Sequence, residues 1–255
     1  MGRPGPAVFQ IGTDGGLLPS PVRLTDFVIS PAERFDVVID FAGLDGKFFV
    51  LNNDAPAPFP DGDDVVPPDV MLFKVTRPLS GPDTSSLPAQ LAPVPLLEEP
   101  SALQVRDLVL SELDSDADNP IIALINNAHW DDPVTENPKA GSIEIWRLIN
   151  TTGDAHPIHV HVVQFQILDR RPFDVDQYPQ KLVNTGPPQQ PPAHERPAFK
   201  DTVQSLPGEV VRIIAKFDLP TGTPVSPGEK FTYVFHCHIL EHEENQMMRP
   251  YDIIG

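Results

Sequence analysis

A short segment near the C-terminus places imidazole, thiol and thioether side chains at fixed spacing. It opens with His236-Cys237-His238 and continues to His242 and Met247. In a type 1 (blue) copper site, two imidazoles and a thiolate form a trigonal set, and a thioether is the weak axial donor. Cys237, His242 and Met247 supply three of these four donors. The segment therefore predicts a type 1 copper site.

The His-Cys-His run also restricts the fold around it. Successive side chains of an extended chain point to opposite faces, so the thiol of Cys237 would face one way and the imidazoles of His236 and His238 the other. A strand here could hold a type 1 copper on one side and help to hold a second copper centre on the other. The short covalent link between the two sides would then be a route for electrons.

A second histidine-rich segment supplies what the first lacks. It reads His156-Pro157-Ile158-His159-Val160-His161. By the period-two rule, His159 and His161 share a face. Since Pro157 favours a turn, His156 is set apart from them and is the candidate for the fourth type 1 donor.

These two motifs resemble the C-terminal copper motifs of the multicopper oxidases, and most closely those of the bacterial laccases of the spore-coat type. The resemblance extends over nearly the whole chain. It includes "FQIGTDGGLLP", "PAERFDVVIDF", "DPVTE", "LDRRPFDV" and "MMRPYDI", at residues 9–19, 31–41, 132–136, 168–175 and 247–253.

The resemblance assigns roles to the motif residues. It implies that His156, Cys237 and His242 bind the type 1 copper, with Met247 as the axial ligand. It also implies that electrons enter through His242 and leave through Cys237.

The same resemblance implies that His159 binds a type 2 copper and that three further histidines bind a type 3 pair: His161, His236 and His238. Glu243 matches a glutamate thought to relay protons to reduced oxygen, and oxygen reduction does consume protons. Asp201, in "KDTV", matches a family aspartate to which the sequence alone assigns no role.

The expected function is that of a laccase-like multicopper oxidase. In such an enzyme, one-electron oxidation of phenols or aromatic amines at the type 1 copper is coupled to four-electron reduction of dioxygen to water at a trinuclear copper cluster. The expected partners are therefore a small reducing substrate and O2. Imidazole and thiolate also suit zinc, but a zinc site would not use the thioether of a methionine ten residues beyond the cysteine.

The histidine count limits this expectation. The family cluster uses eight histidines, four of them from two His-X-His motifs in a first domain, whereas this sequence has eight histidines in all and none before His129. His129 and His194 stand alone in polar loops and are expected to be exposed. The chain is thus expected to hold a complete type 1 site and half of the trinuclear cluster, and to need a missing N-terminal cupredoxin domain. The alternative is a type 1 electron-transfer module without oxidase activity.

Apolar runs of strand length, punctuated by glycine and proline, predict an all-β protein, and Greek-key cupredoxin-like β-sandwich domains are the natural architecture. No sustained helical period competes with them. Six prolines in residues 78–100 predict a linker. We therefore expect a partial second cupredoxin-like domain without copper in residues 1–77 and a copper-binding cupredoxin domain in residues 101–255.

Charge and composition argue against several classes of partner but do not indicate a function. The formal net charge of -18 disfavours nucleic acid and anionic membrane as partners. No apolar run is long enough to predict a membrane span. Cys237 is the only cysteine, so no intramolecular disulfide can form and cysteine usage does not indicate a compartment. Extracellular, periplasmic and spore-coat locations all remain open.

Overall fold

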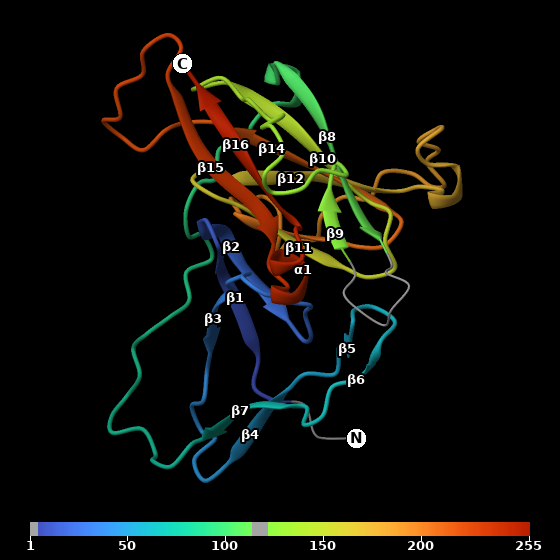
Figure 1. The fold of residues 1–255 in the computed structure, drawn as a ribbon. Helices are drawn as coiled ribbons and strands as arrows, with labels where there is room; N and C mark the ends of the chain where they lie inside the picture. Colours follow the sequence, from blue (N-terminus) through green and yellow to red (C-terminus); the bar gives the residue numbers. More distant parts are fainter. Residues whose placement is uncertain (1–4, 114–121) are drawn as a thin grey trace.

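The computed structural model describes residues 5–113 and 122–255, and almost all of its regular structure is β-strand (Figure 1). The prediction of an all-β protein is confirmed. The C-terminal part contains a five-stranded and a four-stranded sheet, whereas the N-terminal part has three smaller sheets. In the described ranges, none of the helices has the length and apolar character needed to span a bilayer.

The five-stranded sheet has the order β12-β14-β10-β8-β9. Its strands are antiparallel except for the pair β8 and β10. In chain order, they are β8 (Gln104–Leu113), β9 (Ile122–Ile125), β10 (Ile143–Asn150), β12 (Phe165–Pro172) and β14 (Glu209–Lys216).

The four-stranded sheet carries both histidine-rich segments. Its order is β13-β11-β15-β16, and all its pairs are antiparallel. A short helix, α1 (Leu240–Glu244), connects β15 to β16. The strands are β11 (His156–Val160), β13 (Thr202–Ser205), β15 (Lys230–Cys237) and β16 (Met248–Ile254).

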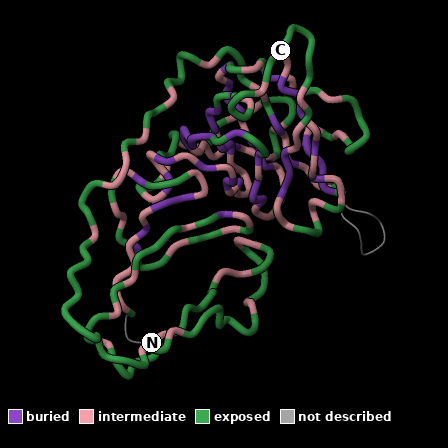
Figure 2. The backbone as a smooth tube through the Cα atoms, turned by 90° about the vertical axis from the view of Figure 1, so that its left-hand side faces the viewer, coloured by how far each residue is buried: buried purple, intermediate pink, exposed green. Residues whose placement is uncertain are grey.

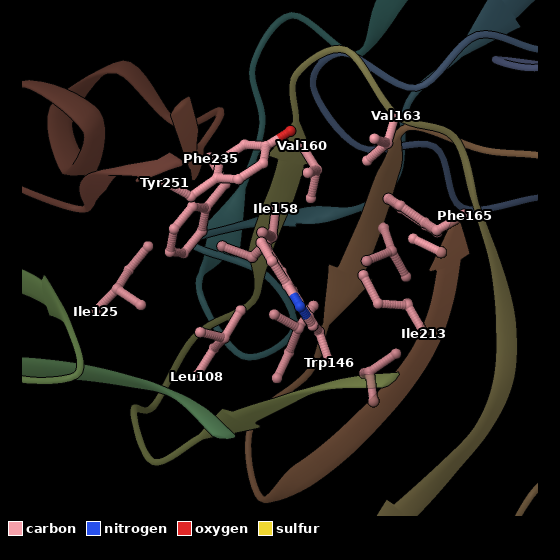
Figure 3. Packing of buried hydrophobic residues seen from close by; sticks show 14 of the residues in the cluster. Leu108, Ile125, Trp146, Ile158, Val160, Val163, Phe165, Ile213, Phe235 and Tyr251 are labelled. Atoms are coloured by element: carbon pink, nitrogen blue, oxygen red, sulfur yellow. The ribbon is translucent and has the colours of Figure 1, made fainter. Parts of the chain in front are cut away.

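One apolar core lies between these two sheets (Figure 3). Trp146 of β10 sits at its centre, with its ring 5.1 Å from Phe217, 5.3 Å from Phe235 and 5.6 Å from Tyr251. Edge-on and tilted contacts at these distances stabilise aromatic clusters beyond the burial of area. Cys237 belongs to the same buried cluster, so its thiol points towards the core side of the sheet.

Among its described residues, which begin at position 5, the N-terminal part has no comparable core. Figure 2 shows its tube mainly in the colours of exposed and intermediate residues. Its first sheet has the order β2-β1-β3, and two two-stranded sheets follow. The strands are β1 (Val8–Thr13), β2 (Gly16–Leu24), β3 (Asp36–Ile39), β4 (Phe48–Asn52), β5 (Pro56–Ala57), β6 (Asp63–Asp64) and β7 (Asp69–Lys74).

Large apolar side chains remain uncovered on β4 and β7. Phe48 is 66% exposed and Val70 is 60% exposed, and Val50, Met71 and Leu72 are each about half exposed. An apolar sheet face of this kind normally packs against another layer. No strand or helix is assigned between β7 and the 3-10 turn Glu99–Ser101, and residues 75–98 form the long connection to the C-terminal sheets.

A buried ionic seam joins the N-terminal part to the C-terminal sheets. Lys200 is fully buried, and its Nζ lies 3.1 Å from both Asp14 Oδ2 and Glu33 Oε1. The backbone N–H of Gly15 donates to the carbonyl of Phe199 at 2.9 Å. A Cβ at Gly15 would lie only 2.3 Å from that oxygen, so only glycine permits this approach. Charges this deep are tolerated because they are paired.

Replacing Lys200 with methionine should lower the free energy of unfolding by about 3–5 kcal/mol, because two carboxylates would lose their buried counter-ion. Urea unfolding measures this cost. Lys216→Met is the matched control, because Lys216 pairs with Asp218 at the surface, where both side chains are about half exposed. That control should cost at most about 1 kcal/mol. Equal costs for the two variants would contradict the role given to the seam.

Candidate metal centre

Three donor atoms converge at the end of β15. Cys237 Sγ lies 3.7 Å from His156 Nδ1 and 3.9 Å from His242 Nδ1, and the two Nδ1 atoms are 3.1 Å apart. His156 begins β11, whereas His242 is in α1, five residues beyond Cys237. The sequence spacing and the strand pairing therefore bring these three side chains together. The expected turn at Pro157 was wrong, because Pro157 lies within β11 and pairs with Gln204.

Met247 closes the same region. It is completely buried and belongs to the core cluster that contains Cys237. The N–H of Cys237 donates to the Met247 carbonyl at 2.9 Å, and the N–H of Met247 donates to the His242 carbonyl at 2.9 Å. These bonds fix the loop around α1. We call His156, Cys237, His242 and Met247 the thiol group.

Neighbouring polar groups orient the ring of His156 for metal binding. The Thr152 hydroxyl donates to Asn150 Oδ1 at 2.8 Å, so its oxygen is left to accept from His156 Nε2–H at 2.7 Å. This leaves Nδ1 unprotonated and directed towards the thiol. Burial lowers the pKa of His156 to about 3, so the ring is neutral at physiological pH, as a metal ligand must be.

Burial keeps the Cys237 thiol protonated at neutral pH. Burial raises the pKa of Cys237 to about 12, although an N–H from Ile239, 3.5 Å from Sγ, partly offsets the effect. A metal ion would replace the proton, because thiolate is the binding form. Two imidazole nitrogens, one thiol and a buried thioether form the donor set of a type 1 copper site. The residues present thus fit that metal.

Four histidines gather on the opposite face of β15. His236 pairs with His159 across the strands, and the Nε2 atoms of His161 and His236 are 3.2 Å apart. The ring centroids of His236 and His238 are 5.3 Å apart, and those of His159 and His161 are 4.9 Å apart. We call these four residues the histidine face. The period-two expectation from the sequence is met.

Hydrogen bonds at Nδ1 turn two of these rings towards a common space. His236 Nδ1 donates to the Cys237 carbonyl at 3.0 Å and lies 3.3 Å from Glu243 Oε2. His159 Nδ1 donates to the Asp201 carbonyl at 2.9 Å. Since these partners are acceptors, the protons are on Nδ1, and each Nε2 keeps a lone pair that a metal could use. Glu243 thus lies beside the histidine face.

Asp201 connects the histidine face to the N-terminal part. Arg34 donates to both of its carboxylate oxygens, at 2.8 and 2.5 Å. Thr202 Oγ1 donates to Asp201 Oδ1 at 2.9 Å and lies 3.0 Å from His159 Nδ1. Burial opposes ionisation of Asp201, but hydrogen bonds from His159, Arg34 and Thr202 hold its pKa below the usual range. The sequence alone gave no role to Asp201 and did not single out Arg34, although both lie in recognised motifs.

The two remaining histidines lie outside both groups. His129 is exposed, as expected. The expectation of an exposed loop was wrong for His194, which is half-buried and packs against Phe35, with a ring separation of 5.9 Å. Its carbonyl accepts from Gln10 of β1 at 3.3 Å. The local proline-rich sequence could not indicate this contact, because it depends on a segment far away in the chain.

A pocket of about 1040 Å³ opens beside His242. One wall is the loop that carries β5 and β6, including Pro56 and Phe59, and Val28 and Ile29 also contribute. His242 Nε2 faces Asp154 Oδ2 at 3.7 Å and Glu112 Oε1 at 3.8 Å. A small molecule in this pocket would therefore reach the edge of an imidazole that belongs to the thiol group.

Comparison with known proteins agrees with this geometry. The multicopper oxidase family model matches residues 102–254. The chain is 48% identical over 252 residues to a laccase from Bacillus stratosphericus and 45% identical over 249 residues to a laccase from Bacillus subtilis. It spans 46% of the length of each, while 97% and 96% of this chain are matched.

Solved structures of multicopper oxidases share this fold. The McoA multicopper oxidase of Aquifex aeolicus superimposes with a TM-score of 0.77 at 28% identity, covering 100% of this chain and 51% of that one. The chain therefore belongs to the multicopper oxidase family. Among the members of that family it is similar to the bacterial laccases, and membership implies copper binding.

The ionisation of Cys237 provides a test of the buried thiol group. In the metal-free protein, the thiolate absorption near 240 nm should appear only as the pH approaches about 12, rather than near 9, the ordinary pKa of a thiol, because burial disfavours the charged form. Subtracting the titration of Cys237→Ser removes the contribution of the tyrosines. A midpoint close to 9 would mean that the thiol is not held in a buried site.

Proposed function

We propose that this chain is the copper-bearing C-terminal part of a laccase-type oxidase. Phenols or aromatic amines would each give up one electron at a type 1 copper held by the thiol group, and four such electrons with four protons would reduce O2 to two molecules of water. The observation that supports this most directly is that Cys237 lies between His236 and His238, so that the thiol group and the histidine face share one strand.

In this proposal, His159 is a type 2 ligand and three residues are type 3 ligands: His161, His236 and His238. Bound copper would supply the redox chemistry. The protein would supply the rest: His242 offers its ring edge to the donor, and Cys237 links the thiol group to the neighbouring imidazoles. Glu243, 3.3 Å from His236 Nδ1, would deliver protons at the histidine face.

The histidine face is half of a trinuclear site, and we propose that an N-terminal cupredoxin domain supplies the other half. Two observations support a missing partner. The matched laccases are about twice as long as this chain. Within residues 5–113 and 122–255, the apolar side chains of β4 and β7 also lack a covering layer, as missing strands of the same domain would provide. We accordingly assign residues 1–77 to a partial second domain, residues 78–100 to a linker and residues 101–255 to the copper domain.

The alternative of a type 1 module without oxidase activity is not favoured by the comparisons, because the relatives are laccases and multicopper oxidases. The two functions differ in their need for the histidine face. In the oxidase, this face takes part in oxygen reduction. In a type 1 electron-transfer module, the histidine face would have no role in the reaction.

Adding one equivalent of copper to the chain should produce the strong visible absorption of a thiolate–copper bond. The Cys237→Ser variant should lack this band, because serine offers no thiolate. Met247→Leu should keep the band and raise the reduction potential, because a weak donor that favours oxidised copper has been removed. Met248→Leu is the matched control, since Met248 lies next to Met247 and outside the thiol group. A band that survives Cys237→Ser would contradict the proposed site.

Oxygen consumption should depend on the missing domain. The chain alone, loaded with copper and given a phenolic donor, should be reduced but should not sustain O2 uptake. A longer protein that adds an N-terminal cupredoxin domain with two His-X-His motifs should sustain uptake, and His161→Ala in it should lower the rate while the visible band persists. An oxygen electrode measures the rate. Full turnover by the isolated chain would contradict the assignment of half a cluster.

A further inference from the structure

The pocket beside His242 carries charge of one sign. Four of the residues that line it are acidic: Asp61, Glu112, Asp154 and Glu241. The lining residues in the described part of the chain include no lysine or arginine. A concave surface with charge of one sign concentrates the field inside it, so the pocket should attract cations more strongly than the acidic protein surface does.

Two of these acids lie at the deep end of the pocket. Asp154 and Glu112 have side chains that are only 16% and 17% exposed, and their oxygens lie within 3.8 Å of His242 Nε2. Partial burial weakens the screening of a charge by solvent. A ligand that reaches the His242 ring edge must therefore come close to both carboxylates. The other two acids, Asp61 and Glu241, are exposed at the rim.

The remaining lining suits a flat aromatic ring. It is mostly apolar, with Val28, Ile29, Ile239, several prolines and Phe59. Pockets that combine apolar walls with a few charged groups bind small organic molecules and fix their orientation.

We infer that this pocket selects cationic aromatic molecules as electron donors and disfavours anionic ones. The inference rests on the proposed function, because a donor must come close to His242 for electron transfer. It names the class of donor that the pocket favours: aromatic amines with a positively charged substituent, in preference to sulfonated or carboxylated rings. Apolar walls would hold the ring, and the acids would hold the charged group.

Redox-inert probes test the inference separately from oxidase activity. Phenyltrimethylammonium and benzenesulfonate have the same ring with opposite charges, and methyl phenyl sulfone is a neutral analogue. Ligand-observed NMR gives their dissociation constants with the metal-free chain. At low salt, we expect the cation to bind about tenfold more tightly than the anion, with the neutral probe between them. The ratio should shrink towards physiological salt, because the Debye length falls to about 8 Å.

Variants at the rim locate the effect. Asp61→Asn combined with Glu241→Gln removes two charges from exposed positions, so the fold should persist, and the preference for the cation should fall several-fold. Asp45→Asn combined with Asp176→Asn is the matched control. It removes two exposed charges outside the pocket lining and should leave the preference unchanged.

Three results would overturn the inference: equal affinities for cation and anion, no binding of the cation, or an equal loss of preference in the control variant. The last would assign the effect to net charge rather than to the pocket. Failure of the oxidase proposal would be seen differently, as the absence of the visible copper band while the binding preference persists. The failure of one proposal can therefore be told apart from the failure of the other.

Discussion

The alternation of side chains along β15 is the constraint on which the rest of the structure depends. Because Cys237 points into the core and His236 points away from it, one strand can serve two sites. The register between β15 and β11 brings the side chains of β11 to both sites. Ile158 lies opposite Cys237 and His159 lies opposite His236, so a slip of one residue would turn the wrong side chain to each face.

The aromatic core between the two large sheets stabilises the register of β11 and β15. Trp146, Phe217, Phe235 and Tyr251 fill the space between the two large sheets and hold β15 and β16 against β10 and β14. The Tyr251 hydroxyl also donates to the His161 carbonyl at 2.6 Å, which ties the core to the histidine face. Packing in the core thus positions the side chains of the thiol group and the histidine face.

The thiol group, the histidine face and the strands that carry them could be predicted from the sequence. The donor spacing in the two histidine-rich segments is local, and side chains alternate along a strand with a period of two. The long-range seam could not be predicted in the same way. Lys200 and Asp14 are ordinary charged residues in the sequence, and only the fold shows that they are buried together. The same holds for Arg34, which reaches Asp201 across 167 positions. The exposure predicted for His194 was wrong for the same reason, because its neighbours come from β1 and from Phe35, far away in the chain.

We propose that the chain on its own forms one complete copper site on the core side of β15 and only half of a site on the other. Native mass spectrometry of the isolated chain, loaded with excess Cu(II) and then exchanged into a weak chelator, tests it directly. One copper per chain should be retained; it should disappear in Cys237→Ser and persist when His159 and His161 are both replaced with alanine. Retention that depends instead on the two replaced histidines, or that survives loss of the thiol, would contradict it.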